Sequence, residues 1–156
     1  MTGRNGDNMR IAILFAALCL NIKSVPQETQ FVQSTIQERN EVSLTNDEYY
    51  LLAKCVEAEA GNQDLKGKRL VVDVILNRVD SERFDNDVIS VISAKNQFSS
   101  YTDGGIAKAI PSLETRLAIS METTAREDTD VLYFTAGGYN AYCTPAYKYG
   151  EHYFGY

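Results

Sequence analysis

The chain has 156 residues, 44% of them hydrophobic, and a formal net charge of −6. This length suits a single domain with a buried core. The acidic balance, without a basic patch, argues against nucleic acid as a partner. Ten tyrosines and no tryptophan are compatible with a polar groove lined by aromatic rings.

The N-terminus does not resemble part of a folded domain. Arg4 and Arg10 precede a nearly continuous apolar stretch, residues 11–22. This stretch is shorter than the roughly 20 residues needed to span a bilayer, and it is typical of the hydrophobic part of a secretory signal. We predict that residues 1–23 are a signal peptide or short N-terminal anchor, with no stable membrane span. The protein would then be secreted or associated with the cell envelope; a short buried helix is the alternative.

A polar segment follows the apolar stretch. Residues 24–43 are rich in Gln, Glu, Ser and Thr and show little periodicity. They are predicted to be a linker, with a short helix over residues 29–37 as the alternative. We therefore expect the folded domain to occupy residues 44–156.

Residues 45–61 predict an amphipathic helix. Thr45 and Glu48 have the spacing of a capping box, and Gly61 is a typical helix end. Apolar residues recur at helical spacing and give the helix one packing face. The residues of this face are Tyr49, Leu52, Ala53, Val56 and Ala60.

Glu59 lies on this apolar face. It follows Leu52 by seven residues and, at about 100° per residue, points only about 20° away from it. Glu57 points about 140° away from Leu52 and is predicted to face solvent. A buried carboxylate is costly, and burial raises the pKa of a carboxyl group, as a general acid requires. Glu59 is therefore a candidate general acid; the alternative is a helix-end carboxylate that turns outward or pairs with an arginine.

Residues 65–79 give the strongest helix signal. Their sequence, LKGKRLVVDVILNRV, has a broad apolar face that is typical of a central buried helix. Asp73, Asn77 and Arg78 are polar residues within this run. Asn77 and Arg78 either tie the helix to a neighbouring loop or mark its solvent side, and both interpretations favour a structural role over a catalytic one.

Shorter elements are predicted after the second helix. Asp87 or its neighbours can cap a short helix over residues 88–94. Residues 97–105 are polar, aromatic and glycine-rich, as loops that face a ligand often are. An ordinary surface loop is the alternative interpretation of residues 97–105.

The C-terminal third predicts one more helix and two strands. Pro111 suits the first turn of a helix that runs to about Arg126. Residues 130–136 and 147–156 are predicted strands because they are rich in β-branched and aromatic residues. Helices followed by a small β-hairpin give an α+β fold class.

The two cysteines beyond the N-terminal segment are Cys55 and Cys143, since removal of the signal would also remove Cys19. In an exported protein they could form one disulfide. Two buried thiols are the alternative, and the bridge is slightly favoured.

The residue inventory limits the possible chemistry. His152 is the only histidine, which excludes the HExxH pattern and disfavours zinc sites that take two or more histidines. We expect no metal and no cofactor. A Cys55–His152 dyad is disfavoured because Cys55 lies within a helix and not at its N-terminus, where its pKa would be lowered. Acid–base chemistry by a carboxyl group remains, and glycoside cleavage is the typical reaction of that kind.

Four blocks of the sequence resemble the SleB/CwlJ-type bacterial cell-wall hydrolases, which include the spore-cortex-lytic enzymes of germination. The blocks are EAEAGNQDLKGKRLVVDVILNRV (57–79), NQFSSY (96–101), DVLYF (130–134) and GEHYFGY (150–156). The resemblance covers about residues 47–156. It implies a mainly helical domain, similar to lysozymes and lytic transglycosylases, with a small C-terminal β-hairpin.

The resemblance also implies roles for individual residues. Glu59 would be the catalytic acid, in agreement with its place on the apolar face, while Asn77 and Arg78 would support the site. Where the family often has Gly-Glu, this chain has Asn62-Gln63, so a second carboxylate in this turn is in doubt. The residues implied to lie in or near a glycan groove are Gln97, Phe98, Ser99, Tyr101 and His152.

We therefore predict a monomeric enzyme that cleaves the bond between N-acetylmuramic acid and N-acetylglucosamine in the glycan strands of peptidoglycan. With Glu59 as the single acid and base, the favoured route is that of a lytic transglycosylase, which forms 1,6-anhydro-muramoyl ends. The close alternative is a hydrolytic muramidase in which Asp73 or Asp103 places a water. Family members have also been labelled amidases, against which the lone histidine argues.

Two alternative functions do not involve catalysis. A non-catalytic module could bind cell-wall glycan through the tyrosine-rich tail. A structural subunit of a phage or secretion device could use the same fold as a spacer.

Overall fold

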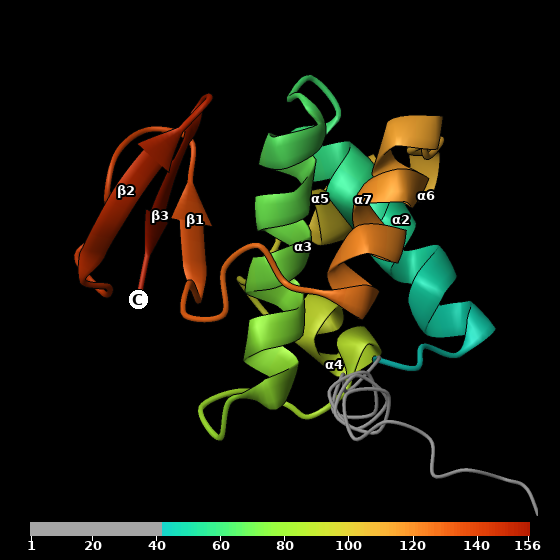
Figure 1. Ribbon diagram of the computed structural model, residues 1–156, viewed down its shortest axis with the longest axis horizontal. Coiled ribbons are helices and arrows are strands. Elements are labelled where there is room, and N and C mark those ends of the chain that lie inside the picture. Colours follow the sequence, from blue (N-terminus) through green and yellow to red (C-terminus); the bar gives the residue numbers. More distant parts are fainter. Residues whose placement is uncertain (1–41) are drawn as a thin grey trace, which may run out of the picture. The chain divides into compact units, whose positions relative to one another are not determined.

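The structure is a computed structural model that describes residues 42–156 (Figure 1). The predicted signal segment, residues 1–23, and the linker up to residue 41 lie outside the described residues. Among the described helices, none has the length and apolar character needed to cross a membrane.

Helix α2, Asn46–Ala60, confirms the first predicted helix and its cap. The backbone N–H of Thr45 donates to Oε2 of Glu48 over 2.9 Å, and the N–H of Glu48 donates to the Thr45 hydroxyl over 3.3 Å. This reciprocal pair satisfies two N–H groups at the helix start that have no partner within the helix. The buried side of α2 consists of Leu52, Ala53, Cys55, Val56 and Ala60.

Helix α3, Leu65–Asp80, is the central element of the fold. Asp64 caps it, because its side chain accepts from the backbone N–H of Gly67 over 2.8 Å. Figure 1 shows α3 between the C-terminal sheet on one side and the other helices on the opposite side. Its residues 70–78 are all buried, so α3 supplies packing surface to both parts of the domain.

Three short helices follow α3. Helix α4, Val88–Ser93, is capped by Asp87 as predicted. The predicted loop over residues 97–105 is wrong in part, because it contains the one-turn helix α5, Ser99–Thr102, and the start of α6, Gly105–Lys108. Gly104, with φ +81°, joins the two turns. Elements of four residues are too short to produce a recognisable helical periodicity.

Helix α7, Leu113–Thr124, begins after Pro111 and packs along α3. Its N-cap is Ser112, whose hydroxyl accepts from the N–H of Thr115 over 3.2 Å. The prediction that Pro111 occupies the first turn is therefore wrong. A serine hydroxyl satisfies a free N–H of the first turn, whereas proline only tolerates that position.

The C-terminal residues form a three-stranded antiparallel sheet in the order β1-β3-β2. The strands are β1, Tyr133–Thr135, β2, Pro145–Tyr149, and β3, His152–Gly155. The predicted pairing of residues 130–136 with residues 147–156 is present as β1 against β3, and β2 adds a third strand. The prediction of one strand over residues 147–156 is wrong, because the chain reverses at Gly150, which has φ +54°, a conformation that glycine adopts readily.

Two apolar clusters lie on opposite sides of α3. The larger cluster fills the space between the helices. The smaller one joins α3 to the sheet and consists of Leu70, Val74, Val131 and Phe154. Phe134 of β1 packs against both clusters, so the sheet is held directly on the helical part.

The predicted Cys55–Cys143 bridge is wrong. Both thiols are free: Cys55 is buried in the helical cluster, and Cys143 is half-buried. The sulfur of Cys143 packs against Gly155 of β3 and donates weakly to the carbonyl oxygen of Asn140 over 3.8 Å. The two side chains therefore occupy separate parts of the domain.

Candidate active site

Glu59 lies in the last turn of α2 and is half-buried. The hydroxyl of Ser100, a buried residue of α5, donates a hydrogen bond to Oε1 of Glu59. The turns α5 and α6 both pack against α2, which places Ser100 beside the carboxylate. Ser100 was not among the predicted site residues, although it lies within the NQFSSY block, because α5 is too short for its helical spacing to be read from the sequence.

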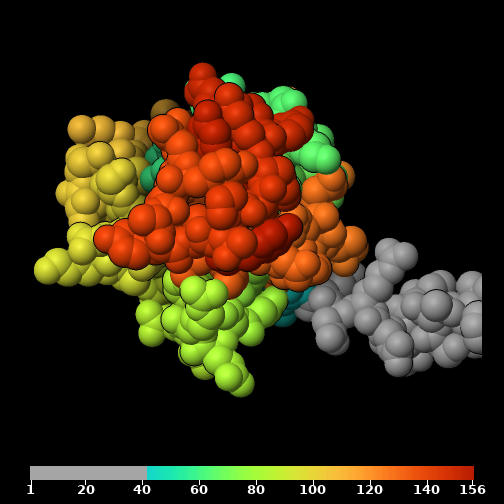
Figure 2. Space-filling model, turned by 90° about the vertical axis from the view of Figure 1, so that its left-hand side faces the viewer, coloured from blue at the N-terminus to red at the C-terminus, as the bar shows by residue number. Residues whose placement is uncertain are grey.

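Glu59 lines a cleft of about 450 Å³ between α2 and the segment that carries α5 and α6. Figure 2 views the molecule from the side of the sheet, where residues 95–108, in gold, stand beside the red C-terminal strands. Besides Glu59 the cleft is lined by Glu57, Ala58, Ser99, Ser100, Asp103, Gly105, Lys108 and Ala109. The lining is mostly polar, and it carries three carboxylates and one lysine.

Glu57 does not face solvent as predicted; it holds the start of α7. Its Oε2 accepts from the backbone N–H and the hydroxyl of Ser112, both over 2.9 Å, and from the hydroxyl of Thr115 over 2.5 Å. Burial acts to raise the pKa of Glu57, but these hydrogen bonds outweigh it and the pKa lies below its ordinary value. Glu57 is thus ionised and committed to structure, which leaves Glu59 and Asp103 as the other carboxyl groups of the cleft.

His152, the first residue of β3, was predicted to lie in or near the groove, but it is only 5% exposed and does not line the cleft; the Glu59 carboxyl group acts on it electrostatically. Its ring packs edge-to-face on Phe134, with ring centroids 5.1 Å apart. Burial lowers the pKa of His152, and this outweighs the opposing effect of the nearby Glu59 and Glu151 side chains. The imidazole is therefore neutral at neutral pH. Its Nδ1 has no hydrogen-bond partner among the described residues.

The other residues assigned to the glycan groove have different surroundings. Ser99 lines the cleft. Gln97 and Tyr101 are exposed on the same segment but are not among the lining residues. The prediction that Phe98 contacts a glycan is wrong, because its side chain is only 3% exposed and packs against Phe134, with ring centroids 6.2 Å apart.

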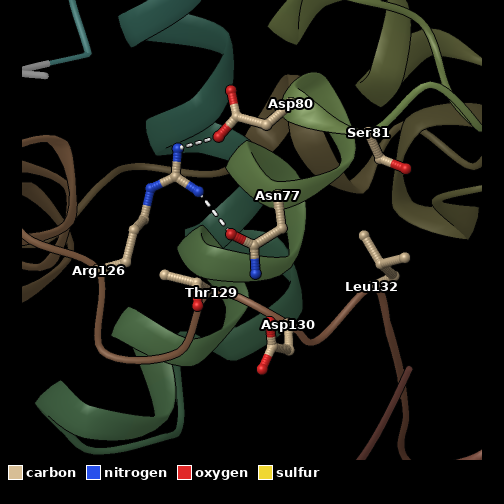
Figure 3. A pocket seen from close by; sticks show the side chains of 7 residues that line it. All are labelled: Asn77, Asp80, Ser81, Arg126, Thr129, Asp130 and Leu132. Atoms are coloured by element: carbon tan, nitrogen blue, oxygen red, sulfur yellow. Dashed lines mark hydrogen bonds and ion pairs between the residues drawn. The ribbon is translucent and has the colours of Figure 1, made fainter.

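Asn77 ties α3 to the segment that leads into the sheet (Figure 3). Its amide nitrogen donates to the carbonyl oxygens of Asp128 and Val131 over 2.9 and 3.0 Å, and its amide oxygen accepts from Arg126 over 2.5 Å. Arg126 also pairs with Asp80 over 2.9 Å. Every polar atom of the Asn77 side chain is thus used in structural contacts, as in a residue that supports a site.

Arg78 connects α3 to both β1 and the α5 region. Its Nε donates to the carbonyl oxygen of Leu132 over 2.7 Å. Its guanidinium carbon lies 5.1 Å from the ring centroid of Phe84, 5.3 Å from Phe98 and 5.7 Å from Tyr133. Burial lowers the pKa of Arg78 to about 10, so the side chain stays charged at neutral pH. Because Phe98 immediately precedes α5, Arg78 also fixes the segment that presents Ser100.

Asp73 is far too enclosed to place a water for the reaction, so that alternative is wrong for this residue. It is fully buried, and its Oδ2 accepts from the backbone N–H of Asp128 over 2.8 Å. Burial, followed by the adjacent Glu122 carboxyl group, raises the pKa of Asp73 to about 9. Asp103, by contrast, lines the cleft with Glu59.

Comparisons with known proteins agree with the fold and the sequence blocks. The model of the cell wall hydrolase family matches residues 62–155, and the match begins three residues after Glu59. One similar solved structure is the catalytic domain of the germination-specific lytic transglycosylase SleB from Bacillus anthracis, at 24% identity and a TM-score of 0.65. That match covers 73% of this chain and 98% of the SleB chain.

A second similar structure is the catalytic domain of the Bacillus cereus SleB protein, at 24% identity and a TM-score of 0.66. It covers 76% of this chain and 97% of that chain. No curated protein gave a significant match. The two structures confirm the predicted mainly helical fold with its small C-terminal sheet. Because the family model matches more than half of the sequence, the chain belongs to the cell wall hydrolase family, as its resemblance to the SleB/CwlJ-type enzymes predicted.

Proposed function

We propose that this cell wall hydrolase cleaves the glycan strands of peptidoglycan between N-acetylmuramic acid and N-acetylglucosamine, with Glu59 as general acid and base. The observation that carries the proposal is the position of Glu59 in the wall of a polar cleft, with Ser100 as a hydroxyl partner. Glu57, the neighbouring carboxylate, is already occupied by Ser112 and Thr115. Residues 44–156 would form the catalytic domain.

The first step is proton donation. Protonated Glu59 gives its proton to the glycosidic oxygen, the bond from that oxygen to C1 of the muramoyl sugar breaks, and positive charge develops on the muramoyl ring. The hydrogen bond from Ser100 orients the carboxyl group and stabilises the carboxylate that forms. The neutral imidazole of His152 adds no positive charge that would oppose the charge on the sugar.

The second step closes a ring. The 6-hydroxyl oxygen of the muramoyl sugar bonds to C1 and transfers its proton to Glu59, which restores the acid and leaves a 1,6-anhydro end. This route needs one carboxyl group and no water. The description of the B. anthracis SleB as a lytic transglycosylase, together with the shared fold, supports it.

Hydrolysis is the second candidate because Asp103 lines the same cleft. In that route Asp103 would position a water that attacks C1, which gives a reducing muramoyl end. The site of action would be outside the cytoplasm in both routes, since peptidoglycan lies there, and this agrees with the signal-like N-terminal segment.

The test is Glu59→Gln on purified peptidoglycan, with mass spectrometry of the wild-type products. Loss of glycan cleavage in a variant that unfolds at the wild-type temperature supports Glu59 as the acid, whereas full activity would remove it from the mechanism. Anhydro-muramoyl ends identify transglycosylation, and products heavier by one water identify hydrolysis. Cell-wall binding without any turnover would favour the glycan-binding module instead.

A further inference from the structure

A second hollow, of about 420 Å³, lies between the turn after α2 and the turn between β2 and β3. We call it the turn pocket; it is lined by Asn62, Gln63, Asp64, Tyr149, Gly150 and Glu151. Glu59 precedes Asn62 by three residues, and His152 directly follows Glu151. The two walls of the turn pocket are therefore close in sequence to Glu59 and His152, although the pocket and the cleft share no lining residue. The carboxyl groups of Glu59 and Glu151 both act electrostatically on His152.

The carboxylate of Glu151 is held in place by the α2–α3 turn. Its Oε2 accepts from the amide nitrogen of Asn62 over 2.7 Å and from that of Gln63 over 3.4 Å. The backbone N–H of Glu151 donates to the amide oxygen of Gln63 over 3.2 Å. Gln63 is in turn fixed by Lys68, whose ammonium group donates to the Gln63 carbonyl oxygen over 2.6 Å. Glu151 is thus preorganised although it is exposed.

Close contact between the two turns requires Gly150. A Cβ atom at this position would lie 2.1 Å from Oε1 of Gln63, so any side chain would displace the amide that holds Glu151. The φ of Gly150, +54°, also favours glycine. The sequence and the turn geometry together maintain this arrangement of Glu151 and Gln63.

Only one carboxylate of the turn pocket has an oxygen available for a ligand. Asp64 uses both of its oxygens, one to accept from the N–H of Gly67 and one to accept from the hydroxyl of Tyr149, each over 2.8 Å. Both amide bonds to Glu151 end on Oε2, and Oε1 accepts no hydrogen bond from residues 42–156. The pocket therefore presents a fixed acceptor beside the ring of Tyr149, which has the Lys66 ammonium group 5.6 Å from its centroid. The amide of Gln63 also donates to the Asn62 amide oxygen over 3.1 Å, which leaves one N–H of Asn62 for a ligand.

This combination fits a sugar ring. Hydroxyl groups of a sugar donate to a carboxylate oxygen, an N-acetyl group exchanges hydrogen bonds with side-chain amides, and the apolar face of the ring packs on an aromatic side chain. We propose that the turn pocket is a saccharide subsite that binds one ring of the glycan strand cleaved at Glu59, with Oε1 of Glu151 accepting from a sugar hydroxyl. The proposal rests on the proposed function, since the strand must also reach Glu59.

A remote subsite has a defined kinetic consequence. Binding energy from parts of the substrate away from the reacting bond raises the rate for long substrates and leaves substrates that do not reach the subsite unaffected. Removal of a hydrogen bond to a charged group costs about 1.5–3 kcal/mol, which corresponds to a decrease in kcat/KM of about tenfold or more.

The experiment compares the full chain with Glu151→Ala and Asn62→Ala on peptide-free glycan oligomers of increasing length. Glu82→Ala serves as the control, because Glu82 is an exposed carboxylate outside both pockets. For Glu151→Ala we expect kcat/KM to fall about tenfold on long oligomers and to change less than twofold on the shortest oligomer that the wild type cleaves. Asn62→Ala, which loosens Glu151, should show the same length dependence with a smaller loss.

Three results would overturn the proposal. An equal loss at every length would mean that Glu151 acts on the chemistry through His152, and no loss at any length would mean that the turn pocket binds no sugar. A loss seen only when the same variants are assayed in parallel on strands that carry stem peptides would assign Glu151 to a peptide amine.

Failure of the proposed function is distinguishable from these outcomes. If the wild type cleaves no glycan, binding of the longest oligomer is measured by calorimetry for the wild type and Glu151→Ala. Weaker binding by the variant would support the subsite without catalysis, and equal binding would overturn it.

Discussion

The hydroxyl of Ser100 donates a hydrogen bond to Oε1 of Glu59, and this contact joins α5 to the last turn of α2. The two residues lie 41 positions apart in the sequence. Phe98, the residue before α5, is buried, and the Arg78 guanidinium lies 5.3 Å from its ring centroid. This packing holds the start of α5, and with it Ser100, in place. The position of the candidate acid is thus set partly by a residue that does not touch it.

Ser100→Ala should lower kcat for glycan cleavage. Loss of a hydrogen bond to a carboxylate is worth about 1.5–3 kcal/mol, so we expect a decrease of about tenfold or more, measured as the initial rate on purified peptidoglycan. Ser99→Ala is the matched control, since Ser99 lines the same cleft without a bond to Glu59. A larger loss for Ser99→Ala than for Ser100→Ala would contradict the assignment.

Glu57→Gln should destabilise the fold by about 1–3 kcal/mol, because the α7 start would lose charge-assisted hydrogen bonds. The pKa of Glu57 in the folded state lies below its ordinary value. Its stabilising effect is therefore present above the unfolded-state pKa and is lost as the pH falls through the folded-state pKa. Urea denaturation of both proteins at pH 7 and pH 3 measures this; a difference that does not shrink in acid would argue against it.

Asp73→Asn should remove a pH dependence of stability. The pKa of Asp73 is raised to about 9 by burial and by Glu122, so the folded state binds a proton that the unfolded state releases. This contribution is fully present below the unfolded-state pKa, about 3.8, and is lost as the pH rises through about 9. Thermal unfolding between pH 5 and pH 9 should show a falling midpoint in the wild type and a flatter profile in the variant.

Asp130→Asn provides the comparison for that experiment. Asp130 is exposed, and its side chain makes no hydrogen bond within the described part of the chain. In this variant the unfolding midpoint should fall with pH as steeply as in the wild type. An unchanged slope in Asp73→Asn would mean that another group causes the pH dependence.

Arg78→Lys should lower the unfolding free energy by about 2 kcal/mol, because lysine has no planar group to stack on three rings while donating to a carbonyl. Arg83→Lys is the comparison, because Arg83 contacts the Tyr133 ring that Arg78 also contacts. Arg83 is exposed, lies 5.6 Å from the Tyr133 ring centroid and donates to the Tyr133 hydroxyl. Its replacement should change stability by less than about 0.5 kcal/mol. Chemical denaturation of both variants measures the difference.

Local patterns in the sequence predicted the long helices well. The capping box at Thr45 and Glu48, the apolar face of α2 and the continuous apolar run of α3 are features of neighbouring residues, and each was confirmed. Helical spacing placed Glu59 on the packing face, whereas the structure leaves it half-buried in the wall of a cleft. The confirmed features depend on 3.6-residue periodicity and capping chemistry, which a single sequence contains.

Contacts between distant segments could not be predicted in the same way. Glu57 was expected to face solvent because its angle on α2 points away from Leu52, but α7 covers it with Ser112 and Thr115. Phe98 was predicted to lie in or near the groove because of its sequence block, but its ring is buried and packs against the Arg78 guanidinium. The turns α5 and α6 are too short for periodicity to reveal, so Ser100 was missed.

The segment from α7 to β1 runs along α3 and is fastened to it at successive turns. Near the start of α3, Lys66 pairs with Glu127 over 2.8 Å. In its middle, the Asp73 carboxylate accepts from the backbone N–H of Asp128. Near its end, the side chains of Asn77 and Arg78 donate to the carbonyl oxygens of Val131 and Leu132. These contacts are spread along most of the length of α3. Strands and helices should consequently melt in one cooperative transition, with calorimetric and van't Hoff enthalpies that agree. The sheet is therefore held firmly on α3, and any widening of the Glu59 cleft would have to come from the α5–α6 segment, which forms its other wall.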